Sequence, residues 1–175
     1  LGTLGSVMRG SLLHVGCGSE QLPAWMQGFK ETRLDINKDT APDIVASMLD
    51  MGEIGEYDCI FCSHAIEHLY PFEVSVAINE FKRCLKVGGY AMVFVPDLEG
   101  VHATDEVLLE SPSGPITGFD MIYGYQKALA EGNLYMAHKT GFVSDTLKQA
   151  FEKEGFSVVQ TKRLKPYNLM AIAIK

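Results

Sequence analysis

The stretch that most constrains the fold is a short apolar run that ends in a Gly-x-Gly turn, Ser11-Leu12-Leu13-His14-Val15-Gly16-Cys17-Gly18. An apolar run without helical periodicity is typical of a buried parallel strand. Two glycines directly after it allow a tight turn and let the backbone approach a bound molecule closely. Asp35 ends the next apolar segment, and an acid at about this spacing is typical of nucleotide sites, where it binds ribose hydroxyls. The third glycine of the dinucleotide pattern is replaced by Gln21, which disfavours a pyrophosphate site and leaves a nucleoside without phosphates as the expected ligand.

Size and charge narrow the class of protein further. A chain of 175 residues that is 47% hydrophobic and 21% charged predicts one globular domain with a core of its own. The net charge is −7 and no block of Lys or Arg is present, so neither nucleic acid nor a membrane is an expected partner. No apolar run approaches the roughly 20 residues of a membrane span, and no signal peptide is visible. A cytoplasmic protein, monomeric or homodimeric, that binds a small-molecule substrate is expected.

The Cys59-x-x-Cys62 spacing resembles a redox or metal pair. These residues lie within 57–63, which is expected to be a strand, and residues three apart on a strand point to opposite faces of the sheet. We therefore expect reduced core cysteines and no disulfide.

The remaining pattern predicts an α/β fold. Strands are expected at 12–15, 33–36, 44–46, 57–63, 90–95, 156–161 and 169–174, the last two joined tightly and therefore antiparallel. Helices are expected at 72–85, 119–131 and 143–154, with a short or irregular helix within 19–29. Gly88-Gly89 is predicted to end the first helix, and Ser144 and Gly155 to cap and stop the last.

The segment between the fifth strand and the last helix is long for a compact domain. Residues 98–115 are expected to form a polar loop, and the whole insert, at about 98–140, is rich in Tyr and Met. Long connections of this kind are usually functional, so the insert is assigned to substrate binding.

Taken together, the motifs resemble those of class I S-adenosylmethionine-dependent methyltransferases, and more narrowly the small predicted, type 11-like members. The matching pieces are Leu13-His14-Val15-Gly16-Cys17-Gly18, Leu34-Asp35-Ile36, Ser63-His64-Ala65-Ile66-Glu67-His68-Leu69, Leu85-Lys86-Val87-Gly88-Gly89 and Val95-Pro96-Asp97-Leu98. The resemblance implies a Rossmann-like, seven-stranded, mostly parallel sheet of order 3-2-1-4-5-7-6, with strand 7 antiparallel and helices on both faces. It also implies one domain over 1–175.

The same resemblance implies S-adenosyl-L-methionine as cofactor and S-adenosyl-L-homocysteine as product. Gly16, Cys17 and Gly18 would lie under the methionine part, Asp35 would bind the ribose diol, and Asp50 and Met51 would bind the adenine. The full set of expected cofactor residues is His14, Gly16, Cys17, Gly18, Asp35, Ile36, Asp50, Met51, Ser63 and His64.

Two histidines are the candidates for catalysis. His64 follows the fourth strand, at the edge where open α/β sheets bind ligands, and His138 lies where the insert returns to the fold. Either could act as general base, because the unperturbed imidazole pKa is near neutral. The expected reaction moves a methyl group to an O, N or C atom of a small molecule or a glycan-type precursor.

Two other functions stay open. The chain could be a non-catalytic, methyltransferase-like binding module, because His14 and Glu20 depart from the family pattern. His64-Ala65-Ile66-Glu67-His68 also matches the H-x-x-E-H pattern of zinc hydrolases. That pattern requires both histidines on one helix, whereas His64 is expected to end a strand, so no metal site is expected.

Overall fold

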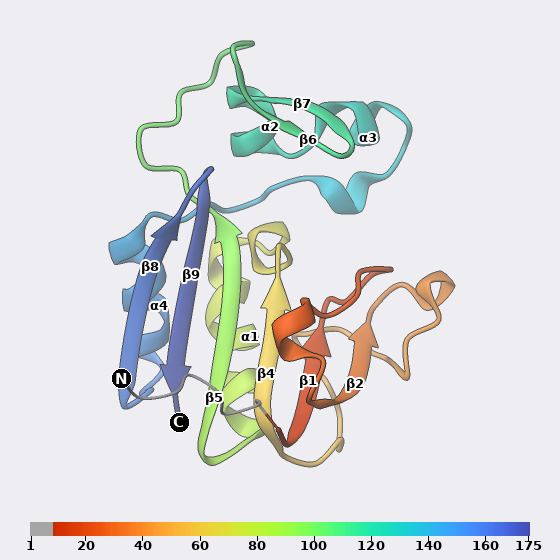
Figure 1. Cartoon of the computed structure of the whole chain (residues 1–175), viewed down its shortest axis with the longest axis vertical. Helices are drawn as coiled ribbons and strands as arrows, with labels where there is room; N and C mark the ends of the chain where they lie inside the picture. The colour runs from red at the N-terminus through yellow and green to blue at the C-terminus, as the bar shows by residue number, and fades with distance from the viewer. Residues whose placement is uncertain (1–8) are drawn as a thin grey trace.

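Seven strands form one sheet in the order β3-β2-β1-β4-β5-β9-β8 (Figure 1). In this computed structural model residues 9–175 are described, so the first eight residues of the expected domain lie outside the described residues. The strands of the sheet are β1 (Ser11–Val15), β2 (Lys30–Asp35), β3 (Ile44–Val45), β4 (Tyr57–Ser63), β5 (Leu85–Pro96), β8 (Val158–Leu164) and β9 (Asn168–Ile174). The first five are parallel, and β9 runs antiparallel to both β5 and β8. The predicted strand order is confirmed, with β9 as the antiparallel seventh strand.

The two long helices, α1 (Pro71–Arg83) and α4 (Ser144–Lys153), lie on one face of the sheet (Figure 1). Their apolar stripes bury Phe81 and Phe151 completely in the larger core. The opposite face carries the smaller core under a three-residue 3-10 turn, η1 (Ala24–Met26), which is the short helix expected within 19–29. No helix among the described residues is long and apolar enough to cross a membrane.

The four cysteines are free and buried. Cys59 belongs to the smaller core and Cys62 to the larger one, on opposite faces of β4. Burial raises the pKa of the Cys59 thiol to about 12, which keeps it protonated at neutral pH. The prediction of reduced core cysteines is confirmed.

The first long helix ends earlier than its sequence pattern indicates. α1 stops at Arg83, and Leu85 already pairs with Tyr57 as the first residue of β5. Gly88 and Gly89 therefore lie inside an irregular strand rather than at a helix end. A Cβ at Gly89 would come within 2.9 Å of the Lys86 carbonyl oxygen, so close backbone packing accounts for the glycine that was misinterpreted as a stop signal.

The prediction of one helix at 119–131 is wrong. The segment forms two short helices, α2 (Gly118–Tyr123) and α3 (Gln126–Ala130). Gly124 separates them with φ of 98°, and a Cβ there would collide with the Met136 carbonyl. A helix cannot continue through that left-handed position.

The expected polar loop at 98–115 is also wrong in part, because it contains a β-hairpin. Its strands are β6 (Val107–Ser111) and β7 (Gly114–Thr117). The hairpin leads into α2, where the Thr117 hydroxyl accepts from the Asp120 N–H and the Asp120 carboxylate accepts from the Thr117 N–H.

Ser144 does not cap α4, contrary to the expectation. Its hydroxyl bonds the Thr161 hydroxyl at 2.7 Å, and it is the first residue of the helix. Val143 takes the cap position, and Thr146 Oγ1 accepts from the Val143 N–H. The predicted stop at Gly155 is confirmed by its φ of 79° directly after the helix end.

The insert lies above the carboxyl ends of the parallel strands (Figure 1). Its neck closes where the Leu98 N–H donates to the Phe142 carbonyl. Arg163, near the tip of the β8–β9 hairpin, pairs with the buried Asp97 at 2.6 Å and with Glu99 at 3.0 Å. These contacts fix the base of the insert to the sheet, so a cleft is bounded by the strand ends below and the insert above.

Candidate active site

The Gly-x-Gly turn after β1 takes the conformation that its glycines permit. Gly16 has φ of 65° and Gly18 has φ of 48°, both in the left-handed region. A Cβ at Gly16 would lie 2.7 Å from the Cβ of Ala65, which follows β4, whereas a Cβ at Gly18 would meet no atom within 4 Å. Gly16 is therefore required by packing, and Gly18 leaves bare backbone facing open space.

Asp35, the last residue of β2, is joined to this turn. Its Oδ2 accepts from the Gly18 N–H at 2.7 Å, and its Oδ1 accepts from the Asn37 N–H at 2.8 Å. A carboxylate has about four acceptor positions, so two remain for a ligand such as a ribose diol. Within residues 9–175, the hydrogen bonds to this half-buried carboxylate come from these two backbone N–H groups.

His14 lies beneath the turn and does not reach the open space. It is 2% exposed, and its Nδ1 lies 2.7 Å from Glu31 Oε1. Burial lowers the pKa of His14, against the opposing effect of Glu31. The Arg33 guanidinium donates to the same Glu31 oxygen at 3.1 Å and to the Gly18 carbonyl at 2.9 Å. Arg33 thereby connects Glu31 to the Gly turn. His14 thus supports the turn, and its direct contact with a cofactor remains a prediction.

The two expected adenine residues differ in exposure. Asp50 is exposed and accepts from the Gly52 N–H, whereas Met51 is 1% exposed and its N–H donates to Glu80 Oε2 at 2.8 Å. Met48 is nearer to the turn, since its Cε lies 3.6 Å from an ideal Cβ on Gly16. Sequence reasoning missed Met48, although it belongs to the same segment after β3. Ile36 is 55% exposed at the edge of the cleft, and its contact with the adenine remains a prediction.

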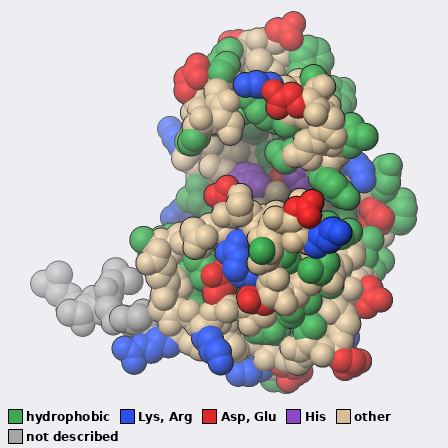
Figure 2. Space-filling model, turned by 90° about the vertical axis from the view of Figure 1, so that its right-hand side faces the viewer, with side chains coloured by type: hydrophobic (Ala, Val, Ile, Leu, Met, Phe, Trp, Pro, Cys, Tyr) green, Lys and Arg blue, Asp and Glu red, His purple; other side chains and the backbone are tan. Residues whose placement is uncertain are grey.

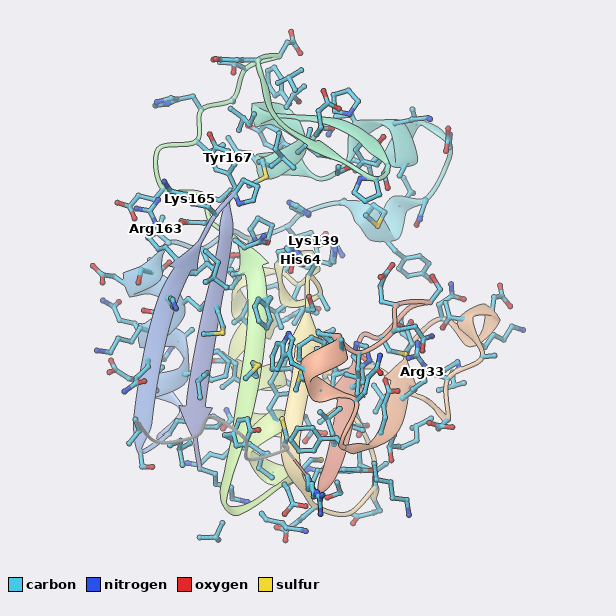
Figure 3. The ribbon with its side chains drawn as sticks, in the orientation of Figure 1. Arg33, His64, Lys139, Arg163, Lys165 and Tyr167 are labelled. Carbon is cyan, nitrogen blue, oxygen red and sulfur yellow. The ribbon has the colours of Figure 1, made fainter. Side chains whose placement is uncertain are left out.

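Ser63 and His64 lie at the carboxyl end of β4, below the insert (Figure 3). His64 has φ of 50°, and its N–H donates to the Phe94 carbonyl of β5. Its side chain is 48% exposed, and its Nδ1 lies 3.5 Å from Glu67 Oε1. Desolvation lowers the pKa of His64, but the Glu67 carboxylate and the Asn168 side chain outweigh it, so the pKa is raised.

His68 and His138 form a second pair next to Glu67. Their rings meet edge to face with centroids 5.1 Å apart. His68 is on the 3-10 turn η3 (Ile66–His68) and His138 follows η4 (Leu134–Met136) of the insert. Burial lowers the pKa of His138, which favours its neutral form at pH 7.

The cleft between insert and sheet has a volume of about 930 Å³. It is lined by the segment after β2, by His68 and by the end of the insert: Ile36, Asn37, Lys38, Asp39, His68, Gly132, Asn133, Leu134, Tyr135 and Lys139. Figure 2 shows histidine side chains at its floor, between the upper and lower parts of the molecule. The edge that carries Asp35 therefore continues into a space large enough for a small molecule.

Sequence reasoning missed the supporting charges on β2. Glu31, Arg33 and Asp35 alternate along the strand, so their side chains share one face next to the Gly turn. A charged residue at every second position is unusual in a strand that lies between two others, and this pattern could have predicted their role. It also missed Asn168, which approaches His64 from β9.

Comparison with known proteins agrees with this architecture. A family model described as a methyltransferase domain matches residues 6–161, and the chain belongs to that family. No curated protein matches the sequence significantly.

Solved structures share the fold at low sequence identity. An S-adenosylmethionine-dependent methyltransferase from Mesorhizobium loti superposes with a TM-score of 0.69 at 16% identity, over 98% of this chain and 94% of the other. The PH0226 protein from Pyrococcus horikoshii gives 0.67 at 14% identity, over 97% and 84%. The glycopeptide N-methyltransferase MtfA, solved with S-adenosyl-L-homocysteine, gives 0.66 at 12% identity, over 97% and 84%. The family model confirms the expected membership in a methyltransferase family, and these solved structures share its fold.

Proposed function

We propose that S-adenosyl-L-methionine binds along the carboxyl edge of β1, β2 and β4. The observation that carries this is the Asp35 carboxylate, which is fixed by the Gly18 N–H next to open space. In the proposed pose the methionine part lies over Gly16–Gly18 and the ribose diol donates to Asp35. The adenine lies near Ile36, with Asp50 accepting from its amino group.

The acceptor is proposed to be a small molecule or a glycan-type precursor that enters the 930 Å³ cleft. The wall from the insert offers Leu134 and Tyr135, each 71% exposed, and the floor offers His68. An apolar wall with a few polar groups suits an organic acceptor, and the net charge of −7 disfavours nucleic acid. Residues 1–175 are proposed to form one domain, with 98–140 as its substrate-binding insert. It also places the protein in the cytoplasm as a monomer or homodimer.

The cofactor supplies a methyl group that is already activated on a sulfonium, so the protein must align the acceptor and exclude water. A base is required only where the acceptor has to lose a proton. His64 is the first candidate, because it is half exposed at the end of β4 and is paired with Glu67. His138 is the second, because burial favours its neutral form.

The test is calorimetric titration with S-adenosyl-L-homocysteine. Binding by the wild-type protein and clearly weaker binding by Asp35→Ala are expected, with Asp105→Ala, an exposed acid of the insert, as control. Absence of heat with the wild type would contradict the proposed site. A binding module would bind the same ligand without turnover, so release of S-adenosyl-L-homocysteine from the cofactor across a panel of hydroxyl, amine and carbon acceptors separates the two functions.

A further inference from the structure

Glu67, His68 and His138 bring three potential metal ligands together below the insert. One ligand atom from each lies within 4.8 Å of the others. Glu67 and His68 are neighbours on η3, and His138 comes from the far end of the insert. We propose that these three residues bind one divalent transition-metal ion.

In both imidazoles one ring nitrogen bonds to the backbone and the other is left for a metal. His68 Nδ1 lies 3.0 Å from the Ala137 carbonyl, and His138 Nδ1 lies 3.0 Å from the Met121 carbonyl. A carbonyl oxygen only accepts, so each Nδ1 carries a proton, and in the neutral ring Nε2 is the nitrogen that can bind a metal. Metal-ligating histidines almost always donate their other ring N–H to a carboxylate, a backbone carbonyl or water, so these carbonyl contacts fit metal ligands.

The carboxylate provides an independent sign of a missing partner. The Glu67 side chain is 2% exposed, and its Oε2 has no hydrogen-bond partner among the described residues. His64 accounts for Oε1 only. An unpaired buried carboxylate oxygen is strongly unfavourable, and a cation held between it and two imidazoles would remove that penalty.

The ligand set selects the kind of metal. Two imidazoles and one carboxylate suit Zn²⁺, Mn²⁺, Fe²⁺ or Co²⁺, whereas Mg²⁺ and Ca²⁺ prefer all-oxygen sites. Three protein ligands also leave a coordination position open. His68 lines the cleft, so this position would take an oxygen of the methyl acceptor; this last step rests on the proposed function.

The proposed metal site differs from the H-x-x-E-H pattern of zinc hydrolases that residues 64–68 match. His64 lies after a strand with φ of 50°, outside the cluster, and the third ligand comes from the insert instead. The H-x-x-E-H match thus contains two of the proposed ligands, Glu67 and His68, but its first histidine is not a ligand and it is not a hydrolase motif. A metal-bound His138 could not act as a base, which would leave that role to His64.

The experiment uses full-length protein depleted of metal by chelator and titrated with Zn²⁺, Mn²⁺ and Co²⁺ without cofactor or acceptor. One ion per chain, visible d–d absorption of the Co²⁺ form and a raised thermal midpoint are expected, because the ion would connect η3 to the insert. Glu67→Gln and His138→Gln should each weaken binding at least about tenfold. His102→Gln, an exposed histidine of the insert, should bind like the wild type.

The outcomes separate this site from the cofactor site. Circular dichroism and S-adenosyl-L-homocysteine binding report whether each variant is folded, and His138→Gln should retain both even if Glu67→Gln does not fold. Substoichiometric metal on the wild type, or equal binding by wild type and His138→Gln, would overturn the metal site and leave the cofactor proposal intact. Stoichiometric metal on a protein that gives no heat with S-adenosyl-L-homocysteine would support the metal site and contradict the proposed cofactor pose.

Discussion

The Oδ2 atom of Asp35 accepts a hydrogen bond from the Gly18 N–H at 2.7 Å, so the acid at the end of β2 and the turn after β1 form one unit. The turn is thereby held in its left-handed conformation next to the strand that supplies the acid. A ligand that bonds to this carboxylate must also lie against the bare backbone of the turn.

Replacing Asp35 should therefore affect binding more than stability. We expect Asp35→Ala to weaken S-adenosyl-L-homocysteine binding by roughly tenfold to a hundredfold, because hydrogen bonds to a charged group contribute about 1.5–3 kcal/mol. Calorimetry measures this directly. Asp35→Asn, which keeps one acceptor oxygen, should fall between Ala and the wild type; equal affinity in all three would show that the carboxylate does not touch the ligand.

Gly16→Ala should destabilise the protein through two effects. The left-handed backbone costs an L-residue about 1–2 kcal/mol, and the new methyl would contact Ala65 at 2.7 Å, adding about 1–3 kcal/mol of overpacking. Gly52→Ala is the matched control, because Gly52 has φ of 72° and nothing within 4 Å of its Cβ position. Urea unfolding should show a clearly larger loss for Gly16→Ala, and equal losses would mean that the contact with Ala65 relaxes without penalty.

Asp58 should give stability a measurable acid dependence. The Ser11 N–H, the Lys86 ammonium and the Ser11 hydroxyl hold the pKa of Asp58 at about 2. A lowered folded-state pKa stabilises the fold above the unfolded pKa, and this contribution is lost as the pH falls through 3.8 toward 2. Because the side chain is 40% exposed, solvent screening limits the effect.

We expect Asp58→Asn to lose about 1 kcal/mol of unfolding free energy at pH 7 and progressively less below pH 4. Chemical denaturation of both proteins across this range checks it. A difference between the two proteins that stays constant down to pH 3 would mean that the carboxylate charge contributes nothing to this site.

The interaction between His14 and Glu31 should affect the pKa of His14. Burial lowers the pKa of His14, and Glu31 opposes the effect. Glu31→Gln removes the opposing charge, so the pKa of His14 should fall further below its ordinary value. NMR of the imidazole resonances measures this shift, and an unchanged pKa would show that the 2.7 Å contact is absent in solution.

Local patterns predicted the sheet well, because the apolar residues of each strand lie next to one another in the sequence. The run at 57–63 matches β4 at both ends, and the tail at 169–174 differs from β9 by one residue. Helix ends were harder, since Leu85 continues the α1 stripe but is taken by pairing with Tyr57. The break at Gly124 depends on a distant carbonyl, that of Met136, which no local pattern contains.

The residues of the candidate site also divide into those that local sequence predicts and those that depend on distant parts of the chain. Gly16, Gly18 and Asp35 were found because strand, turn and acid follow one another at a fixed spacing. The cluster of Glu67, His68 and His138 was not, because about seventy residues of chain separate His68 from His138 and only folding brings them together. The H-x-x-E-H motif contains two of the three, but no metal site was expected from it because His64 was expected to end a strand.

The placement of the four cysteines has a practical consequence. All four thiols are buried, so a thiol-labelling reagent can react only when the surrounding structure opens. Three of these thiols lie away from the Gly turn and one, Cys17, lies within it. The rate at which Cys17 is labelled relative to the other three thus compares opening of the ligand edge with opening of the whole molecule, using reporters that the chain already carries.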